Sequence, residues 1–397
     1  MIPKDDLKTI NESDLDSLIQ NEIQEDKTLE YKREFPLISK ENKQKFLEGV
    51  SSFANASGGD LIIGIKVDSE SKLPKILVGV SISSQPIDEM VRGLDDIIRQ
   101  GIQPRIPIYS IQPIKLKTSN YAIVIRIKKS WIGPHRITLG GYDKFYTRGA
   151  AGKYPMDVTE LRSAFLLTET RIEKIKSFIL ERISSVYSNE APCPLNEGAK
   201  VILHVIPFSA FDPEHIIAFQ ENEKIIDQVR TITNYQPPFD YNIDGGIKIN
   251  QIFHKNYSYE YIQFFRNGII ESVCGNFLIS HENKCIPLYK FEKCLIETTD
   301  NYLKTLKLLK IYPPILIQIS LTNIKNYRRY ESTDFDFEKL PEIYKDIIQL
   351  PAAIIEDYER KSEQILHNAF NALSNACGLP KSCSYDVNGK WVKNSLF

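Results

Sequence analysis

The chain has 397 residues, of which 42% are hydrophobic, so it has enough apolar material for packed cores and is not an intrinsically disordered chain. Its length allows two domains, and its formal net charge of −1 argues against a general polyanion binder. No apolar run reaches the roughly 18 residues that a membrane-spanning helix needs. The polar, acidic N-terminus and six scattered cysteines without a Cys-x-x-Cys pair lead us to expect no secretory signal, reduced thiols and a cytoplasmic protein.

The first half of the chain predicts an alternation of strands and helices. Helices are expected at 12–23, 40–56, 86–100 and 157–187, and strands at 28–35, 61–67, 76–80, 106–116 and 121–128. The helix at 40–56 has Ser39 as its candidate N-cap and Gly58-Gly59 at its end. This mixture predicts an α+β domain with a mixed or antiparallel sheet and flanking helices.

A linker at 188–194 separates this domain from a second one, which we also expect to be α+β. Its strands are expected at 201–206, 259–265, 269–273 and 314–321, and its helices at 288–310 and 350–375. An Asn267-Gly268 turn predicts a hairpin between two of these strands. The apolar stripe of the 157–187 helix is long for one small domain. It either supports a homodimer or packs between the two domains, and the sequence leaves both alternatives open.

The charges are distributed unevenly. Residues 1–30 carry nine acids and three lysines, whereas residues 115–153 carry nine Lys or Arg and one acid, Asp143. Basic residues of the second segment are candidates for contacts with phosphate groups: Lys128, Lys129, His135, Arg136, Lys144, Arg148 and Lys153. Trp131, Tyr142 and Tyr146 lie among them and are candidates for stacking on unpaired bases. The alternatives are that the charges solvate exposed strands and that Trp131 and Tyr146 are core residues.

Three carboxylates, Glu25, Glu30 and Asp68, belong to two predicted strands joined by one helix. Carboxylate oxygens are ligands for Mg²⁺ or Mn²⁺, which polarise a phosphoryl oxygen and activate a bound water. Lys32 shares a strand face with Glu30 and would offset charge on the attacked phosphate. Glu25 joins the cluster only if the strand begins after it or bends there. In the alternative interpretation, Glu30 and Lys32 form a solvated pair and Asp68 caps a turn.

The first domain resembles the Schlafen AlbA-like family. The matching segments are Glu25 and Glu30 with Tyr31-Lys32, then the run from Ser52 through Gly58-Gly59 to Ile65, and later Gly133-Pro134-His135, Tyr146-Thr147-Arg148-Gly149, Pro155-Met156-Asp157 and Glu160-Leu161. Members of this family are described as nucleic acid binders, and the animal Schlafens as endoribonucleases that act on tRNA. Those nucleases use two glutamates and one aspartate with a divalent metal, and the resemblance implies that Glu25, Glu30 and Asp68 are the counterparts.

The resemblance has a limit, because the nuclease Schlafens contain two related lobes in one chain and only one is visible here. Either the protein pairs with itself or the second domain has another task. A phosphate loop of the Walker type is absent from the sequence, which argues against ATP hydrolysis.

The sequence therefore predicts a Schlafen AlbA-like domain at 1–168, a connecting helix at 157–188 and an α+β domain of unknown role at 195–397. The predicted function is a metal-dependent endoribonuclease that uses Mg²⁺ or Mn²⁺ and acts on tRNA or other structured RNA. RNA is the preferred partner and DNA a possible one, and bacterial stress or antiphage defence is the expected setting. The alternative is a non-catalytic DNA- or RNA-binding regulator or an interaction module.

Overall fold

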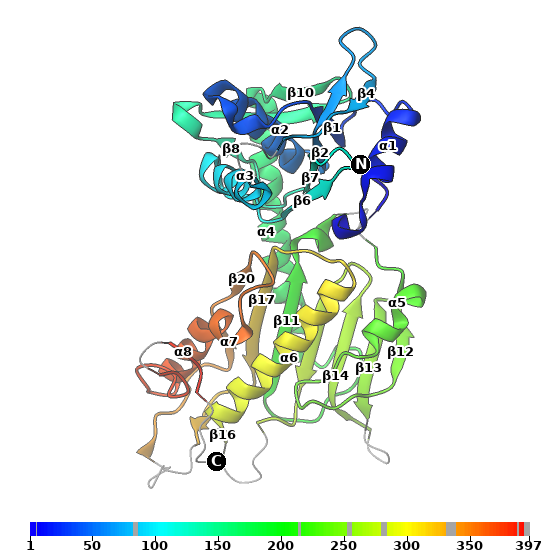
Figure 1. The fold of residues 1–397 in the computed structure, drawn as a ribbon. Coiled ribbons are helices and arrows are strands. Elements are labelled where there is room, and N and C mark those ends of the chain that lie inside the picture. Colours follow the sequence, from blue (N-terminus) through cyan, green and yellow to red (C-terminus); the bar gives the residue numbers. More distant parts are fainter. Residues whose placement is uncertain are drawn as a thin grey trace. The chain divides into compact units, whose positions relative to one another are not determined.

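The computed structural model describes residues 1–4, 6–81, 86–212, 216–251, 256–278, 284–330, 339–386 and 389–392. The chain divides into two compact units, Met1–Thr170 and Arg171–Phe397 (Figure 1). Each unit combines helices with sheets around its own hydrophobic core, so the α+β class expected from the sequence is confirmed.

The N-terminal unit contains three complete α-helices, the first part of a fourth, and ten strands among its described residues. The helices are α1 (Glu12–Gln20), α2 (Lys40–Asn55), α3 (Ile87–Gly101) and α4 (Val158–Tyr187). The strands are β1 (Leu29–Lys32), β2 (Gly59–Ile63), β3 (Ile65–Val67), β4 (Pro74–Leu77), β5 (Ile102–Gln103), β6 (Tyr109–Lys115), β7 (Tyr121–Ile127), β8 (Arg136–Ile137), β9 (Lys144–Gly149) and β10 (Gly152–Pro155).

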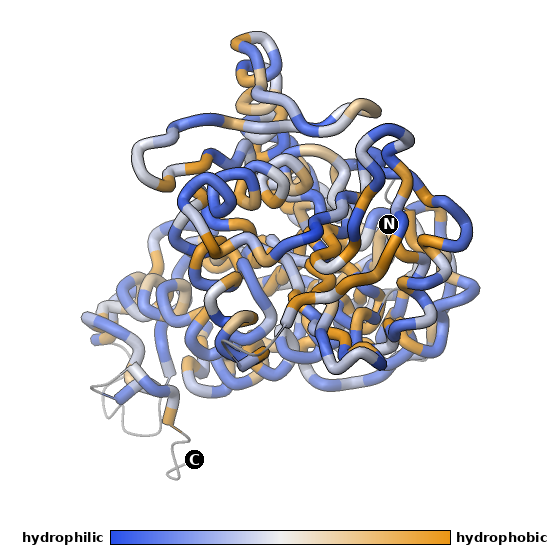
Figure 2. Tube along the Cα trace, turned by 45° about the horizontal axis from the view of Figure 1, so that its top comes forward, coloured by the Kyte–Doolittle hydropathy of each residue, from blue (hydrophilic) through white to orange (hydrophobic). Residues whose placement is uncertain are grey.

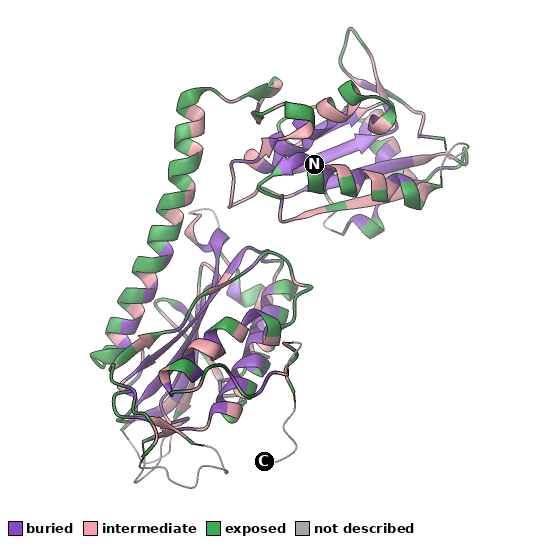
Figure 3. Cartoon of the chain, turned by 90° about the vertical axis from the view of Figure 1, so that its left-hand side faces the viewer, coloured by how far each residue is buried: buried purple, intermediate pink, exposed green. Residues whose placement is uncertain are grey.

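The main sheet of this unit has the order β1-β2-β7-β6 and is mixed, because β1 runs parallel to β2 while the other neighbours are antiparallel. Helices α2 and α3 cover one face, and α1 with the N-terminal segment covers the other. A second sheet, β10-β9-β8-β5, lies beside α2. The central strands β2 and β7 are buried almost along their whole length, whereas the edge strand β6 is mostly half-buried. Buried strands are drawn in purple in Figure 3, and hydrophobic and hydrophilic segments alternate along the chain in Figure 2.

Helix α2 begins and ends where the sequence predicts. The Ser39 side chain accepts a hydrogen bond from the backbone N–H of Asn42, and the helix ends before Gly58, whose φ is 75°. A Cβ on Gly58 would lie 2.8 Å from the Ile127 carbonyl oxygen, and a Cβ on Gly59 would lie 2.2 Å from the Phe53 ring. The two glycines are therefore required by the close packing of α2 against the sheet.

The strand expected at 61–67 is split into β2 and β3 at Gly64. This glycine has a φ of 108°, and a Cβ there would lie 2.9 Å from the Gly79 backbone. The chain turns at Gly64 because only a residue without a side chain fits this close approach. Strand β3 then pairs with β4 in a separate hairpin.

The C-terminal unit is built on an eight-stranded antiparallel sheet with the order β12-β13-β14-β15-β11-β17-β19, in which β20 also pairs with β17. The strands of this sheet are β11 (Lys200–Pro207), β12 (Phe239–Asn242), β13 (Gly245–Gln251), β14 (Ser258–Phe265), β15 (Ile270–Cys274), β17 (Ile315–Thr322), β19 (Ile347–Gln349) and β20 (Ala353–Ile355). Strands β16 (Cys285–Ile286) and β18 (Arg328–Arg329) form a separate two-stranded sheet. The helices of the unit are α5 (Phe219–Ile226), α6 (Leu288–Leu308), α7 (Ser362–Ile365) and α8 (His367–Ala376), together with the second half of α4.

Helix α6 lies across one face of this sheet (Figure 1) and contributes Phe291, Leu295 and Tyr302 to the core. The predicted hairpin is confirmed as β14–β15, with Gly268 at a φ of 89°. The predicted helix at 350–375 is wrong in its first part, where β20 adds to the sheet edge instead. None of the helices in the described part of the chain is long and apolar enough to cross a membrane.

Candidate functional site

Glu30 is a buried carboxylate on the edge strand β1. Leu29 and Tyr31 of this strand point into the core beneath α1, and the alternation of a strand places Glu30 and Lys32 on the opposite face, toward α2. Only 4% of Glu30 is exposed. A Cβ on Gly49 of α2 would lie 3.2 Å from both carboxylate oxygens of Glu30, so the glycine makes room for this acid.

Three basic side chains surround the Glu30 carboxylate. Arg148 of β9 donates a hydrogen bond to Oε2, Lys32 Nζ lies 2.6 Å from Oε1, and Lys153 Nζ of β10 lies 3.6 Å from Oε1. The Arg148 guanidinium also lies 3.9 Å from the centroid of the Phe53 ring and is almost fully buried. The expectation that Lys32 and Glu30 share a face is confirmed.

These cations keep Glu30 ionised. Burial acts to raise the pKa of the Glu30 carboxyl, but Lys153, Lys32 and Arg148 outweigh burial and lower the pKa to about 2. Burial lowers the pKa of the Lys153 ammonium, and Glu30 opposes this shift. The cluster therefore holds a charged acid beneath two partly exposed lysines.

A second acid, Glu48 of α2, extends the cluster. Lys153 Nζ lies 3.5 Å from Glu48 Oε2, and the Tyr142 hydroxyl donates to Glu48 Oε1 at 3.2 Å. The hydroxyls of Tyr142 and Tyr146 are 2.6 Å apart. Tyr146 is only 8% exposed, so it is a core residue and is not available for base stacking, while Tyr142 is half-buried.

Glu48, Lys45 and Ser52 also belong to this cluster, although the sequence did not single them out as site residues. Ser52 Oγ lies 3.3 Å from Arg148 Nη1, and the Lys45 carbonyl oxygen accepts a hydrogen bond from Lys153 at 2.7 Å. One signal for Glu48 was present, namely an acid directly after Phe46-Leu47 on the apolar side of a predicted helix.

Glu25 and Asp68 do not join Glu30. Glu25 precedes β1, as the prediction required, but its Oε1 accepts a hydrogen bond from the backbone N–H of Tyr31 at 2.7 Å. Asp68 occupies the β3–β4 turn, where its carboxylate accepts from the backbone N–H groups of Glu70 and Ser71 and lies 2.8 Å from Lys75 Nζ. The hydrogen bond from Lys75, followed by those from the turn, lowers the pKa of Asp68.

The predicted three-carboxylate site for Mg²⁺ or Mn²⁺ is therefore not assembled in this structure. Among the described residues, no group of three or more His, Cys, Asp or Glu side chains is arranged to hold a metal ion. The physical reason is that Glu30 and Asp68 are each already neutralised by basic side chains, and Glu25 is engaged by a backbone amide. These donors, as they stand, do not fit one shared ion.

His135 is the clearest correction among the predicted phosphate contacts. It is fully buried, and its Nδ1 lies 2.7 Å from the Pro104 carbonyl oxygen. Burial lowers the pKa of its imidazole to about 4, so the ring is neutral at pH 7. Asn55 holds the same residue, since its Oδ1 accepts from the His135 N–H at 2.7 Å and its Nδ2 donates to the His135 carbonyl at 3.0 Å. Both side chains have structural roles, as does the buried Arg148.

The other predicted contacts are at least partly exposed. Arg136 Nε lies 3.6 Å from Asp143 Oδ1, and Lys144 Nζ lies 5.3 Å from the Tyr142 ring centroid. Lys129 Nζ lies 4.3 Å from the ring centroid of the half-buried Trp131, and Lys128 is half-buried beside it in sequence. These cations remain accessible to a large anion.

The fold and this cluster define an α+β domain with an acid-centred group of basic residues along α2. Residues 25–157, about a third of the chain, match the family model described as Schlafen, AlbA_2, so this segment is similar to that family. The resemblance inferred from the sequence is thereby confirmed. No curated protein matches the chain.

Eighteen chains of known structure match, and two illustrate the range of coverage. The solution structure of the N-terminal domain of a putative ATP-dependent DNA helicase RecG-related protein from Nitrosomonas europaea is 19% identical, with a TM-score of 0.23, and the match covers 29% of this chain and 70% of that one. The crystal structure of the DIP2311 protein from Corynebacterium diphtheriae is 16% identical, with a TM-score of 0.24, and the match covers 36% of this chain and 30% of that one.

Proposed function

We propose that the N-terminal unit binds nucleic acid through a basic surface that follows helix α2. The basic surface consists of Lys32, Lys45, Lys129, Arg136, Lys144 and Lys153. Lys153 donates to the Lys45 carbonyl near the start of α2, and the N–H of Ser130, next to Lys129, donates to the Ala54 carbonyl near its end at 2.9 Å. Residues 45 to 54 of a helix span about 14 Å, which is several phosphate spacings of a nucleic acid strand.

The observation that carries this proposal is the set of cations fixed by Glu30 and Glu48. Lys32 and Lys153 are partly exposed, yet their ammonium groups are held by buried acids, which removes rotamer entropy before binding. Pre-ordered cations lose less free energy when they contact a phosphate than freely moving lysines do. The family match supports the same direction, because the Schlafen resemblance implies nucleic acid binding.

RNA with unpaired bases is the preferred ligand class in this proposal. The half-buried rings of Tyr142 and Trp131 lie beside Lys144 and Lys129, so an unpaired base has an aromatic face next to a phosphate contact. Such pairing of cations with rings suits single-stranded loops, whereas duplex DNA does not present its base faces.

Binding of a fluorescent single-stranded RNA at several salt concentrations tests the proposal. We expect the logarithm of the wild-type association constant to fall linearly with the logarithm of the salt concentration. Each phosphate contact to a single strand contributes about 0.7 to the slope. The Lys45→Ala/Lys144→Ala double variant, which loses two such contacts, therefore reduces the slope by about 1.4. Lys345→Ala, which removes one positive charge from an exposed site in the C-terminal unit, keeps the wild-type slope. A wild-type affinity that does not depend on the salt concentration overturns the proposal.

Cleavage is a separate and finer hypothesis, which the Schlafen resemblance contributes. Incubation with tRNA and Mn²⁺ tests it, with Asp68→Ala as the diagnostic variant. Cleavage that is lost in this variant supports a metal-dependent endoribonuclease in which the three acids rearrange. Absence of cleavage, or equal cleavage by the variant, leaves the nucleic-acid-binding proposal intact and removes the nuclease.

A further inference from the structure

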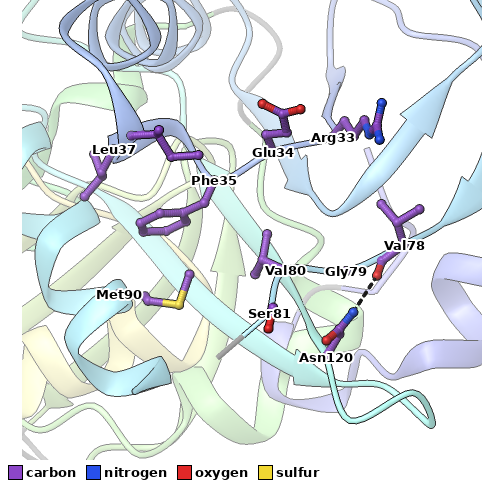
Figure 4. A pocket seen from close by; sticks show the side chains of 11 residues that line it. Arg33, Glu34, Phe35, Leu37, Val78, Gly79, Val80, Ser81, Met90 and Asn120 are labelled. Atoms are coloured by element: carbon purple, nitrogen blue, oxygen red, sulfur yellow. Dashed lines mark hydrogen bonds between the residues drawn. The ribbon is translucent and has the colours of Figure 1, made fainter. Parts of the chain in front are cut away.

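Two cavities in the N-terminal unit share a wall formed by Arg33 and Glu34. The smaller has a volume of about 220 Å³ and lies against α2, and the larger has a volume of about 610 Å³ and lies beside the segment Val78–Ser81 (Figure 4). Neither cavity is lined by the buried Glu30 or Arg148, and the smaller one adjoins the cluster described above through Lys32.

The smaller cavity is strongly cationic. Lys32, Arg33 and Lys45 line it together with the Asn42 side chain, and Glu34 is the one acid among the described lining residues. Arg33 is exposed and forms no ion pair with any residue that the structure describes. Among the described residues Lys45 forms an ion pair with the exposed Glu41, at 2.6 Å, and such a surface pair is weak enough to yield to a better anion.

The larger cavity is apolar in its interior. Phe35, Leu37, Val80 and Met90 face into it, and the Asn120 side chain stands at its edge, donating to the Val78 carbonyl at 3.0 Å (Figure 4). Its volume lies within the range of small-molecule pockets, about 300–1,000 Å³, and its lining of apolar and aromatic groups with a few polar ones has the usual composition. A flat, mostly apolar ring fits this lining.

We infer that the smaller cavity binds a terminal phosphate and that the larger one receives the attached nucleoside, so that the pair of cavities recognises a nucleotide with a free phosphomonoester. This inference rests on the proposed function when the nucleotide is the end of a nucleic acid strand. A phosphomonoester carries about −1.5 to −2 charges at pH 7 and three acceptor oxygens. Lys32 is held by Glu30 at 2.6 Å, so Arg33 and Lys45 supply the charge, and two cations match a phosphomonoester better than the single charge of an internal phosphodiester. Arg33 also provides a planar fork for two of the oxygens.

Three otherwise identical short RNAs test the inference by fluorescence anisotropy: one with a 5′-phosphate, one with a 3′-phosphate and one with hydroxyl groups at both ends. The wild type binds one phosphorylated strand about tenfold more tightly than the hydroxyl strand, as expected for one additional charge-assisted contact. Arg33→Ala reduces this ratio to about one, since it removes that contact. Arg33 has no partner among the described residues, so its loss does not threaten the fold.

Arg136→Ala is the matched control, because it removes the same charge from the basic surface outside both cavities. It weakens binding of all three strands and preserves the ratio between them. Competition by adenosine 5′-monophosphate distinguishes a site for free nucleotides from a site for the ends of nucleic acid strands. Displacement of the phosphorylated strand by the free nucleotide shows that the cavities accept both, and no displacement restricts the site to strand ends.

Equal affinity of the wild type for all three strands, with no competition by the nucleotide, overturns the inference. In that case a salt-dependent affinity for the hydroxyl strand still upholds the proposed function. Failure of the proposed function has a different signature, namely the absence of salt-dependent binding to any of the strands.

Discussion

Arg148 places its guanidinium against the Glu30 carboxylate on one side and 3.9 Å from the centroid of the Phe53 ring on the other. The acid comes from β1, the cation from β9 and the ring from α2, so three elements meet at this ion pair. Because both charges are buried, neither has water as an alternative partner. Glu30 is thus a structural acid in the first instance, and any ligand role for it requires Arg148 to find another partner.

The variant Glu30→Gln tests this structural role. It leaves Arg148 without a counter-ion in a buried position, and the loss of one partner of a buried pair costs about 3–5 kcal/mol. We expect the free energy of unfolding, measured with urea, to fall by an amount of that order. Glu25→Gln is the control, because an amide oxygen can still accept from the Tyr31 N–H, and we expect little change. Equal stability of the two variants would contradict the structural role.

Acid stability provides a test of His135. The pKa of this imidazole is lowered from 6.5 to about 4 in the folded protein because the ring is buried. Between these two values the unfolded chain binds a proton that the folded chain does not, so stability falls as pH decreases from 6.5 to 4. The loss is on the order of 3 kcal/mol.

We expect His135→Asn, which keeps a donor near the Pro104 carbonyl, to flatten the pH dependence in this window. The measurement is the urea midpoint as a function of pH. A variant with the same slope as the wild type would show that His135 is not the responsible group.

Removal of divalent ions tests the metal hypothesis independently of cleavage. Since Glu30 and Asp68 are paired with basic side chains, binding of RNA in the presence of EDTA should equal binding in Mg²⁺. Titration of the protein with Mn²⁺ by calorimetry should likewise give no saturable heat. A Mn²⁺ site that disappears in Asp68→Ala would mean that the acids rearrange around the ion, and would favour the nuclease.

The sequence predicted the fold where patterns were local. Helix α2 was found from Ser39, its apolar spacing and the Gly58-Gly59 end, all within twenty residues. The predicted helix at 350–375 was wrong in its first part, where Ala353–Ile355 form strand β20. Its true partner, β17, lies more than thirty residues earlier in the chain, and such pairings leave no periodic signal.

The site was predictable only in part, because pairings between distant segments of the chain leave no periodic signal in the sequence. Strand alternation placed Glu30 and Lys32 on one face, which the 2.6 Å ion pair confirms. The identity of the remaining partners depends on β9 and β10, which are more than a hundred residues away. Arg148 was expected to contact phosphate because it belongs to the basic segment 115–153, and its pairing with the buried Glu30 reverses that expectation.

The C-terminal unit offers a last prediction, which concerns the attachment of α4 to its sheet. Glu271 of β15 is fully buried and accepts hydrogen bonds from Arg182 Nε and Nη2 of α4, both at 2.8 Å, from the Tyr261 hydroxyl at 2.8 Å, and pairs with His204 Nε2 at 2.9 Å. The buried His204 thus has a carboxylate partner through its Nε2. Burial acts to raise the pKa of Glu271, but Arg182 and His204 outweigh it and lower the pKa to about 2.

Glu271→Gln should therefore cost about 3–5 kcal/mol, since it leaves the Arg182 guanidinium half-buried without its charge partner. The stabilising effect of the wild-type carboxylate is complete above its ordinary pKa of 4.5 and is lost as pH falls toward 2. Hydrogen exchange of the α4 amides in residues 175–186 should accelerate in the variant. Asp346→Asn, which alters the exposed contact of the same helix through the Tyr187 hydroxyl, should leave that exchange slow. If both variants accelerate exchange equally, the buried Arg182–Glu271 pair is not what holds α4 to the sheet.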